Sequence, residues 1–526
     1  MTYSSNGASS EARSDRSWVQ SVVVTADQMA AIETRLFDAG MPVAALMEKV
    51  AGLIAQRIQA LYPLGEGRRV GVLVGPGHNG GDALVVAREL WLRGYTVLLH
   101  GPFSRCKDLT AAHQRYAEAL GIPGSDRFED LQACHVLIDG LFGFGLTRPL
   151  EGAIATLVDQ INTWKKPVVS IDLPSGLHTD TGAVLGTALR ATHTLCLGLW
   201  KAACLQDGAL NYLGQVEWLD FDLPQADLQA VVGLAPSLRR VTVATAIAAL
   251  PAPVITTHKY EQGHVLLVAG SQTYPGAALL TALGARASGA GMVSIAVPAS
   301  LRVLIVNQVP EALVIPCPED DTGAIAHLPS NLDLRRYDAI ACGPGLSRGA
   351  QAVLETILAA PCPLLLDADG LNGLADLKLV SSLRSRSQPT ILTPHPGEFK
   401  RLFPHLTDQM SDRLSVVRQA AQDSGAIVLL KGARVAIASD QQVWINPEST
   451  PALARGGSGD VLTGLAGGIL SQTAPAAEPV LRAIATAAWW HAQAGCLAAA
   501  QRTTRGVDAF TLTQFLIPAL RQHPIP

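Results

Sequence analysis

The residues best suited to chemistry lie together in a glycine-rich stretch, Gly456-Gly457-Ser458-Gly459-Asp460, which runs directly into an apolar, helix-like segment. Glycines let successive backbone N–H groups converge without a Cβ in the way. A helix that begins there adds unpaired N–H groups and a positive dipole end, which favour a phosphate or the charge that develops in phosphoryl transfer. A carboxylate beside a phosphate suits a general base, so Asp460 is the first candidate catalytic residue. The alternative is that Asp460 only caps the helix.

Three further carboxylates follow expected strands in the first half of the chain. The strand expected over 69–74 runs into a glycine-rich turn that ends at Asp82, and two later strands end at Asp139 and Asp172. The carboxyl ends of parallel strands share one edge of a sheet, so these side chains can converge on one crevice. Carboxylates at such short distances repel one another unless a cation lies among them or one of them is protonated. Loop capping is the alternative for each residue taken alone.

The turn before Asp82 also satisfies G-x-G-x-x-G through Gly75, Gly77 and Gly80, ahead of a helix expected over 83–92. Two features argue against the dinucleotide version of this pattern. The next strand ends in His100 rather than in an acidic residue that would hold a ribose, and Asp82 stands where a pyrophosphate would lie. We therefore expect a phosphate- or cation-binding turn of another kind.

The second half of the chain offers weaker candidates at its own strand ends. Lys431 follows a buried strand and suits a nucleotide phosphate, although a turn lysine is more often a surface residue. His395 lies between two prolines that restrict its backbone, and it is otherwise an exposed loop histidine. Asp367 and Asp369 are either turn caps or part of a rim shared with Asp460.

Strands and helices alternate throughout both halves, which predicts two doubly wound α/β domains. With 526 residues the chain is too long for a single ordinary core. We expect a disordered polar leader over residues 1–20, a Rossmann-like three-layer sandwich over 21–228 and a second domain over 238–526. In the first domain, Thr25 and Gln28 fit a capping box that opens a helix.

Composition excludes several classes of function. The formal net charge of −4 gives no basic footprint for nucleic acid. The eight cysteines are scattered without a CxxC pair, which indicates reduced thiols in a cytoplasm. No apolar run reaches 18 residues, and the most apolar late segment contains His491, so we expect no membrane span. We expect a cytoplasmic homo-oligomer that acts on small molecules.

The motifs GPGHNGGD, IDGLFGFGL and IDLPSGLHTDTG together resemble the NAD(P)H-hydrate epimerase domain, the YjeF N-terminal family, over about residues 25–225. The family has Asn where His78 stands here. The resemblance implies that Asp172 contacts the substrate and is the candidate acid/base, and that Asn79, Asp139 and Ser175 hold a K⁺ ion. It also implies a set of residues that line the hydrated nicotinamide nucleotide: His78, Asn79, Gly80, Gly81, Asp82, Gly143, Phe144, Gly145, Leu146, Thr147, Arg148, Pro149 and Asp172.

The motifs HKYEQG, GPGL, LDADGLN, LTPHPGEFKRL, LLKGA and GGSGDVLTG occur in order and resemble the ADP-dependent NAD(P)H-hydrate dehydratase domain, a ribokinase-like fold, over about residues 240–522. The resemblance implies that Asp460 is the catalytic base. It implies three further sets: an anion hole of Gly456, Gly457, Ser458 and Gly459; contacts to the hydrated nucleotide from Ala278, Gly345, His395 and Asp460; and contacts to ADP or AMP from Lys431, Gly432, Ala433, Arg434, Val435 and Gly459.

Together the two resemblances imply a bifunctional repair enzyme for hydrated nicotinamide cofactors. Its first domain would exchange the R and S epimers of NADHX and NADPHX, using K⁺. Its second would dehydrate the S form with ADP and Mg²⁺, releasing AMP and phosphate. Two alternatives remain open: the second half is a ribokinase-type small-molecule kinase, and the first half is a non-catalytic nucleotide-binding module.

Overall fold

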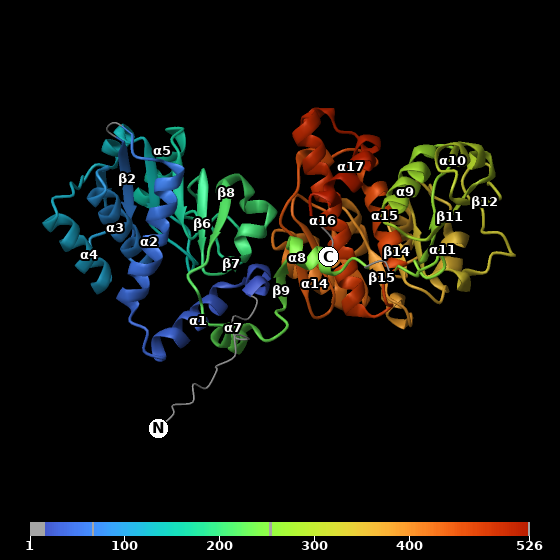
Figure 1. Ribbon diagram of the computed structural model, residues 1–526, viewed down its shortest axis with the longest axis horizontal. Coiled ribbons are helices and arrows are strands. Elements are labelled where there is room, and N and C mark those ends of the chain that lie inside the picture. Colours follow the sequence, from blue (N-terminus) through green and yellow to red (C-terminus); the bar gives the residue numbers. More distant parts are fainter. Residues whose placement is uncertain (1–15, 66–67, 252–254, 524–526) are drawn as a thin grey trace, which may run out of the picture. The chain divides into compact units, whose positions relative to one another are not determined.

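The computed structural model describes residues 16–65, 68–251 and 255–523 (Figure 1). By internal packing the chain forms two compact units: an N-terminal unit that runs to Cys204 and resumes at Gly208–Pro236, and a C-terminal unit of Leu205–Asp207 and Ser237 onward. Most of the leader that we expect to be disordered lies outside the described residues. Its end differs from that expectation, because Arg16–Ser21 forms a short 3₁₀ helix in which Val19 is buried in the core.

The N-terminal unit is built on a six-stranded sheet of order β3-β2-β4-β5-β6-β8, with every pairing parallel. Its strands are nearly continuous apolar runs, as expected for a sheet covered on both faces. They are β2 (Arg69–Val74), β3 (Thr96–His100), β4 (Val136–Gly140), β5 (Val168–Ile171), β6 (His193–Leu197) and β8 (Gln215–Leu219). The strands expected over 69–74 and before His100, Asp139 and Asp172 are all confirmed.

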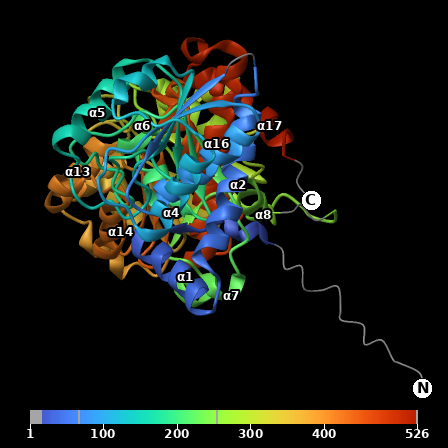
Figure 2. The same cartoon turned by 90° about the vertical axis from the view of Figure 1, so that its left-hand side faces the viewer.

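The helices of this unit are α1 (Ala26–Asp38), α2 (Val43–Leu61), α3 (His78–Leu92), α4 (Asp108–Ala119), α5 (Gly152–Thr163), α6 (Leu210–Leu213) and α7 (Gln225–Val232). Helix α1 opens with the expected capping box of Thr25 and Gln28. It lies beside α7 in both views, and Arg35 of α1 forms an ion pair with Asp227 at 3.0 Å (Figures 1 and 2). A two-stranded parallel pair, β1 (Val23–Val24) with β7 (Trp200–Lys201), fixes the start of α1 next to residue 201.

The C-terminal unit contains a ten-stranded sheet of order β12-β11-β10-β13-β14-β15-β16-β17-β18-β9. Its strands are β9 (Leu238–Arg240), β10 (His264–Val268), β11 (Met292–Pro298), β12 (Leu313–Cys317), β13 (Ala339–Cys342), β14 (Leu364–Leu366), β15 (Thr390–Leu392), β16 (Ile427–Leu430), β17 (Val435–Ala438) and β18 (Val443–Asn446). The strands from β12 to β16 are parallel, whereas β17 pairs antiparallel with both neighbours. The doubly wound sheet is thus extended at one edge by a hairpin.

The helices of this unit are α8 (Val243–Ala248), α9 (Pro275–Ala287), α10 (Arg302–Gln308), α11 (Gln351–Leu358), α12 (Asp369–Asp376), α13 (Pro396–Leu402), α14 (Arg413–Ser424), α15 (Ser458–Leu470), α16 (Ala477–Arg502) and α17 (Ala509–Arg521). Helix α15 packs closely on α9, since a Cβ on Gly464 would lie 1.9 Å from the Thr281 carbonyl oxygen. This contact fixes the middle of α15 against α9. Within the described ranges no helix is both long enough and apolar enough to cross a bilayer.

Candidate active sites

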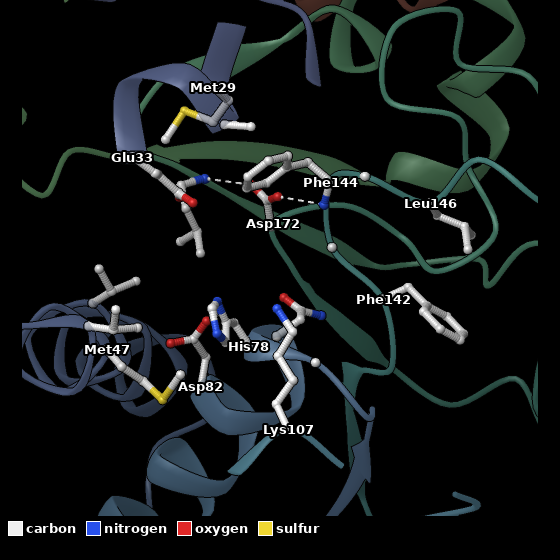
Figure 3. Close-up of a pocket in the computed structure, with 18 of the residues that line it drawn as sticks. Met29, Glu33, Met47, His78, Asp82, Lys107, Phe142, Phe144, Leu146 and Asp172 are labelled. Carbon is white, nitrogen blue, oxygen red and sulfur yellow. Dashed lines mark hydrogen bonds between the residues drawn. The ribbon is translucent and has the colours of Figure 1, made fainter. Parts of the chain in front are cut away.

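A cavity of about 750 Å³ lies at the carboxyl ends of the strands in the N-terminal unit (Figure 3). Most of the residues that the epimerase resemblance implies line it: His78, Asn79, Asp82, Gly143, Phe144, Gly145, Leu146, Thr147, Arg148 and Asp172. Gly80, Gly81 and Pro149 do not. The two glycines are buried in α3, where a Cβ would lie 1.9 Å from the Gly75 carbonyl oxygen or 2.7 Å from the Met47 side chain, so they serve packing.

The start of α3 differs from expectation. The sequence predicts a loop up to Asp82, but the helix begins at His78 with Gly77 as its N-cap. Close packing of the small residues against the strand end outweighs the poor helix propensity of glycine. Asp82 therefore projects from the first turns of a helix into the cavity, and burial raises its pKa well above the ordinary value, with the charges of Glu33 and Asp172 adding to the effect.

Asp172 is held by contacts on both oxygens. Its Oδ1 lies 2.6 Å from the ammonium of the buried Lys201, and its Oδ2 accepts the Phe144 N–H at 3.0 Å. Burial lowers the pKa of Lys201, but the Asp172 carboxylate outweighs it and the net shift is upward. The Asp172 backbone has φ 67°, in the left-handed region, a strain that is found preferentially at functional sites.

Of the three residues implied for K⁺, Asn79 lines the cavity, whereas Asp139 and Ser175 are buried and do not line it. Asp139 is fully buried, and it accepts hydrogen bonds from the Ser170 and Ser175 hydroxyls and from the Ser175 N–H. Among the described residues it has no cationic partner, and burial raises its pKa. Asp139 does not line the cavity, so only two of the three expected carboxylates, Asp82 and Asp172, reach it.

Asn79 and Gly143 complete this region. The buried Asn79 amide nitrogen has no hydrogen-bond partner within the described ranges. A Cβ on Gly143 would lie 3.0 Å from the Asn79 Oδ1 and 3.4 Å from the Asp172 Oδ2, so the absence of a side chain leaves room between these oxygens. Carboxylate, hydroxyl and amide oxygens are the hard ligands that an alkali cation prefers, and this donor set fits K⁺.

Three charged side chains at this cavity were missed by the sequence analysis. Lys201 comes from β7, Lys107 from the turn before α4 and Glu33 from α1. The two-residue strand β7 has no periodicity to mark it, and Glu33 lies on a helix that looks ordinarily amphipathic. Burial raises the pKa of Glu33 to about 7, with the lysines opposing and Asp172 reinforcing the shift.

In the C-terminal unit, Asp460 projects from the first turn of α15. The N-cap is Gly457, with φ 89°, and makes no side-chain capping bond, so the interpretation of Asp460 as the N-cap is wrong. Burial, followed by the negative charges of Asp367 and Asp369, raises the pKa of Asp460 to about 7, while Lys431 opposes the shift. A carboxyl group with this pKa is divided between acid and base forms at neutral pH.

Lys431 is not a surface lysine. Its ammonium lies 2.5 Å from the Asp367 Oδ1, and the Thr463 hydroxyl donates to the other oxygen of Asp367 at 2.7 Å. A Cβ on Gly459 would lie 3.2 Å from the Lys431 Nζ and 3.6 Å from the Asp367 Oδ2. The glycine-rich stretch, the lysine and Asp460 therefore share one small volume at the start of α15.

The loop from Lys431 to Val435 is fixed by two residues that sequence reasoning did not single out. The Arg413 guanidinium donates to the carbonyl oxygens of Leu430 and Lys431 at 3.1 Å. Asp207 pairs with Arg413 and accepts the N–H groups of Ala433 at 3.1 Å and Arg434 at 2.7 Å. Asp207 belongs to the short segment that packs with the C-terminal unit.

The remaining dehydratase candidates lie at neighbouring strand ends. Gly345, with φ 65°, lies against Tyr274 and Ala277 at the start of α9. Ala278, one position further on, is fully buried and exposes no surface to a ligand in this structure. His395 is half exposed, and it caps α13 by accepting the N–H groups of Gly397 and Glu398.

His491 on α16 contacts Ser458 in the glycine-rich stretch. Its Nε2 lies 3.0 Å from the Ser458 carbonyl oxygen and 3.2 Å from the Ser458 hydroxyl, and burial lowers its pKa to about 4. The ring is therefore neutral and positions Ser458 without adding charge. Its only signal in the sequence is a lone histidine in an apolar helix.

Comparison with known proteins matches both halves of the chain to families. Residues 43–203 match the YjeF-related protein N-terminus, and residues 265–518 match NAD(P)H-hydrate dehydratase. The bifunctional NAD(P)H-hydrate repair enzyme of Synechocystis is 55% identical to this chain over 502 residues, which cover 95% of each chain. The bifunctional NAD(P)H-hydrate repair enzyme of Thermosynechococcus vestitus is 53% identical over 505 residues, which cover 95% of this chain and 97% of the relative. The ADP/ATP-dependent NAD(P)H-hydrate dehydratase of Bacillus subtilis, co-crystallised with ATP and Mg²⁺, is 33% identical and covers 54% of this chain and 98% of its own, with a TM-score of 0.47.

Proposed function

Because the chain belongs to the family of bifunctional NAD(P)H-hydrate repair enzymes, we propose that its two sites divide one repair between them. The cavity of the N-terminal unit exchanges the R and S epimers of hydrated NADH and NADPH. The site at the start of α15 dehydrates the S epimer at the expense of ADP. The observation that carries this assignment is the position of Asp460, a carboxyl with a pKa of about 7 beside backbone N–H groups and Lys431.

In the dehydratase site, hydroxide is a poor leaving group and must first be converted into a phosphate. The ionised Asp460 takes the proton of the ring hydroxyl, whose oxygen attacks the terminal phosphorus of ADP and releases AMP. The N–H groups of Gly456–Gly459 and the Lys431 ammonium stabilise the charge on the transferred group. Phosphate then leaves as the ring nitrogen lone pair forms a C=N⁺ bond, and loss of a proton from the adjacent ring carbon to the departing phosphate restores the nicotinamide double bond.

Mg²⁺ enters this site as part of the nucleotide complex. No cluster of three or more His, Cys, Asp or Glu side chains that could hold a metal occurs in residues 16–65, 68–251 or 255–523. Mg²⁺ in phosphoryl-transfer sites is held largely by phosphate oxygens and water, so the absence of a carboxylate cage fits the ion as a nucleotide companion. The ion would neutralise charge on the phosphates of ADP.

In the epimerase site, Asn79, Asp139 and Ser175 would hold K⁺ at the base of the cavity. A monovalent cation there would balance the buried charge of Asp139 and fix the floor against which the substrate binds. Phe144 and the residues that follow it up to Arg148 form one wall of the cavity, and His78 is the first residue of α3. Asp172 contacts the substrate and acts as the base of the exchange.

The experiment that tests both assignments follows near-UV absorbance of reduced nicotinamide from a mixture of R and S epimers with Mg²⁺, K⁺ and ADP. Complete recovery is expected, since a dehydratase alone leaves the R form behind. Recovery that stops at the S fraction would reduce the N-terminal unit to a binding module. A stable phosphorylated product in place of free phosphate would instead identify a small-molecule kinase.

We also propose that the protein works in the cytoplasm, since all eight cysteines are free thiols. A homo-oligomer stays a prediction that sedimentation velocity would test.

A further inference from the structure

Helix α1 contributes one face of the N-terminal cavity. Met29, Glu33 and Phe37 recur at intervals of four residues on it and all line the cavity, with Ala30 and Thr34 between them. Residues 26–38 precede the part of the chain that matches the YjeF-related family, and Glu33 lies in none of the glycine-rich motifs. The β1–β7 pair, in which Val24 lies opposite Lys201, anchors this helix next to the Asp172–Lys201 ion pair.

In contrast to Asp172, Glu33 is not held in this cavity by an ion pair with any described residue. It is half-buried, and no described residue forms a hydrogen bond or an ion pair with it. Its pKa of about 7 is set by burial, with Lys201 and Lys107 lowering it and Asp172 raising it. Asp172 differs, because both of its oxygens are engaged by Lys201 and the Phe144 N–H.

The other ionisable groups that face Glu33 come from several elements. Burial raises the pKa of Asp82 well above the usual value, and burial lowers the pKa of His78. The groups that line the cavity with Glu33 are His78, Asp82, Lys107, Arg148, Asp172 and Lys201. Figure 3 shows Glu33 and Asp172 on the same side of the cavity and Asp82 opposite them.

We propose that Glu33 is the catalytic acid of epimer exchange and works with Asp172 as base. The inference rests on the epimerase function proposed above. Both oxygens of Asp172 accept, from the Lys201 ammonium and from the Phe144 N–H, whereas Glu33 is held by no such contact among the described residues, so Glu33 is suited to donate a proton and Asp172 to accept one.

The reaction balances with water as the only co-reactant. The hydrated carbon is bonded to the ring nitrogen, so protonation of its hydroxyl by Glu33 lets the C–O bond break as water departs and the nitrogen lone pair forms a C=N⁺ bond. A second water attacks the opposite face and gives a proton to Asp172. The epimer is inverted with no net change in composition, and the enzyme now holds its proton on Asp172, which is the form that processes the other epimer.

The test is Glu33→Gln in the full-length chain, with Asp27→Asn as the matched control, because Asp27 is an exposed acid on the same helix and does not line the cavity. Removal of a general acid lowers the rate by about 10²–10⁴-fold, so R-to-S exchange should fall by that factor in Glu33→Gln and not in Asp27→Asn. ADP-dependent dehydration of pure S epimer should be unchanged. Wild-type protein that fails to exchange epimers would refute the proposed function itself, whereas normal exchange by Glu33→Gln would overturn only the role of Glu33.

The pH profile separates a catalytic from a structural role. Glu33 must be protonated to donate, so wild-type exchange should decline as pH rises through about 7, and Glu33→Asp should restore part of the rate together with a descending limb. The residual rate of Glu33→Gln should lack that limb. A slow Glu33→Gln variant that retains the limb would overturn the proposal, as would inversion in ¹⁸O-labelled water without incorporation of ¹⁸O.

Discussion

The replacement of Asp460 by asparagine is the sharpest perturbation of the dehydratase site. Asparagine has nearly the same shape and can keep the polar contacts at the start of α15, but it cannot accept a proton. General bases contribute about 10²–10⁴ in rate, so kcat for S-epimer dehydration should fall by that factor, which corresponds to a barrier increase of about 2.7–5.4 kcal/mol. The exposed Asp440 offers a matched control in the same unit, and Asp440→Asn should leave kcat unchanged.

The sign of the pH dependence follows from the role of base. Asp460 acts only when ionised, so activity should rise as pH increases. With a pKa of about 7, about one tenth of the Asp460 side chains are ionised at pH 6 and about nine tenths at pH 8. In wild-type protein kcat/KM, which reports ionisation in the free enzyme, should therefore increase roughly tenfold between these pH values.

The assay is the absorbance of regenerated NADH from purified S epimer at saturating ADP and Mg²⁺, measured from pH 6 to 8. Asp460→Asn should give a low rate without the ascending limb. A variant that keeps more than about a tenth of wild-type kcat would refute the assignment of Asp460 as base. So would a variant in which the limb near pH 7 persists, because another group would then be responsible for it.

Three further changes test the supporting contacts. Asp207→Asn weakens the acceptor that holds the loop after Lys431, so the KM for ADP should rise by about tenfold, at 1.4 kcal/mol per decade, with epimer exchange unaffected. Lys201→Met removes the ion-pair partner of the buried Asp172 carboxylate. This change should abolish epimer exchange and destabilise the N-terminal unit by about 3–5 kcal/mol. The double variant with Asp172→Asn should recover most of that stability in a thermal melt. Gly143→Ala places a methyl group 3.0 Å from the Asn79 Oδ1, so the K⁺ concentration for half-maximal exchange should rise, whereas an unchanged K⁺ requirement would place the ion elsewhere.

The sequence was most informative where the chemistry is local. A glycine-rich stretch with Asp460 marks the start of α15 because the backbone conformation, the helix dipole and the carboxylate all lie within five consecutive residues. The parallel strands of the first unit could be predicted from the sequence for a similar reason, since buried strands are short apolar runs bounded by turn residues.

Residues whose roles depend on tertiary contacts could not be predicted from the local sequence. Lys201 follows a strand end by a few residues with no pattern, and only the β1–β7 pairing brings it next to α1. Asp207 carries no local mark of its contact with a loop more than 200 positions later in the chain. The early start of α3 was missed because its glycines are tolerated by close packing, which propensity does not describe.

The same dependence on environment explains how carboxyl groups of one kind take opposite duties in this protein. Glu33 and Asp460 both have a pKa of about 7, and burial is the main cause in each case. Their surroundings differ: Glu33 shares its cavity with Asp172, which is paired with Lys201, whereas Asp460 lies beside backbone N–H groups and Lys431, which favour an incoming anion. A shared pKa near neutrality therefore fixes only that each group can exchange a proton at physiological pH, and in the roles proposed above the surrounding charges decide that Glu33 donates it and Asp460 accepts it.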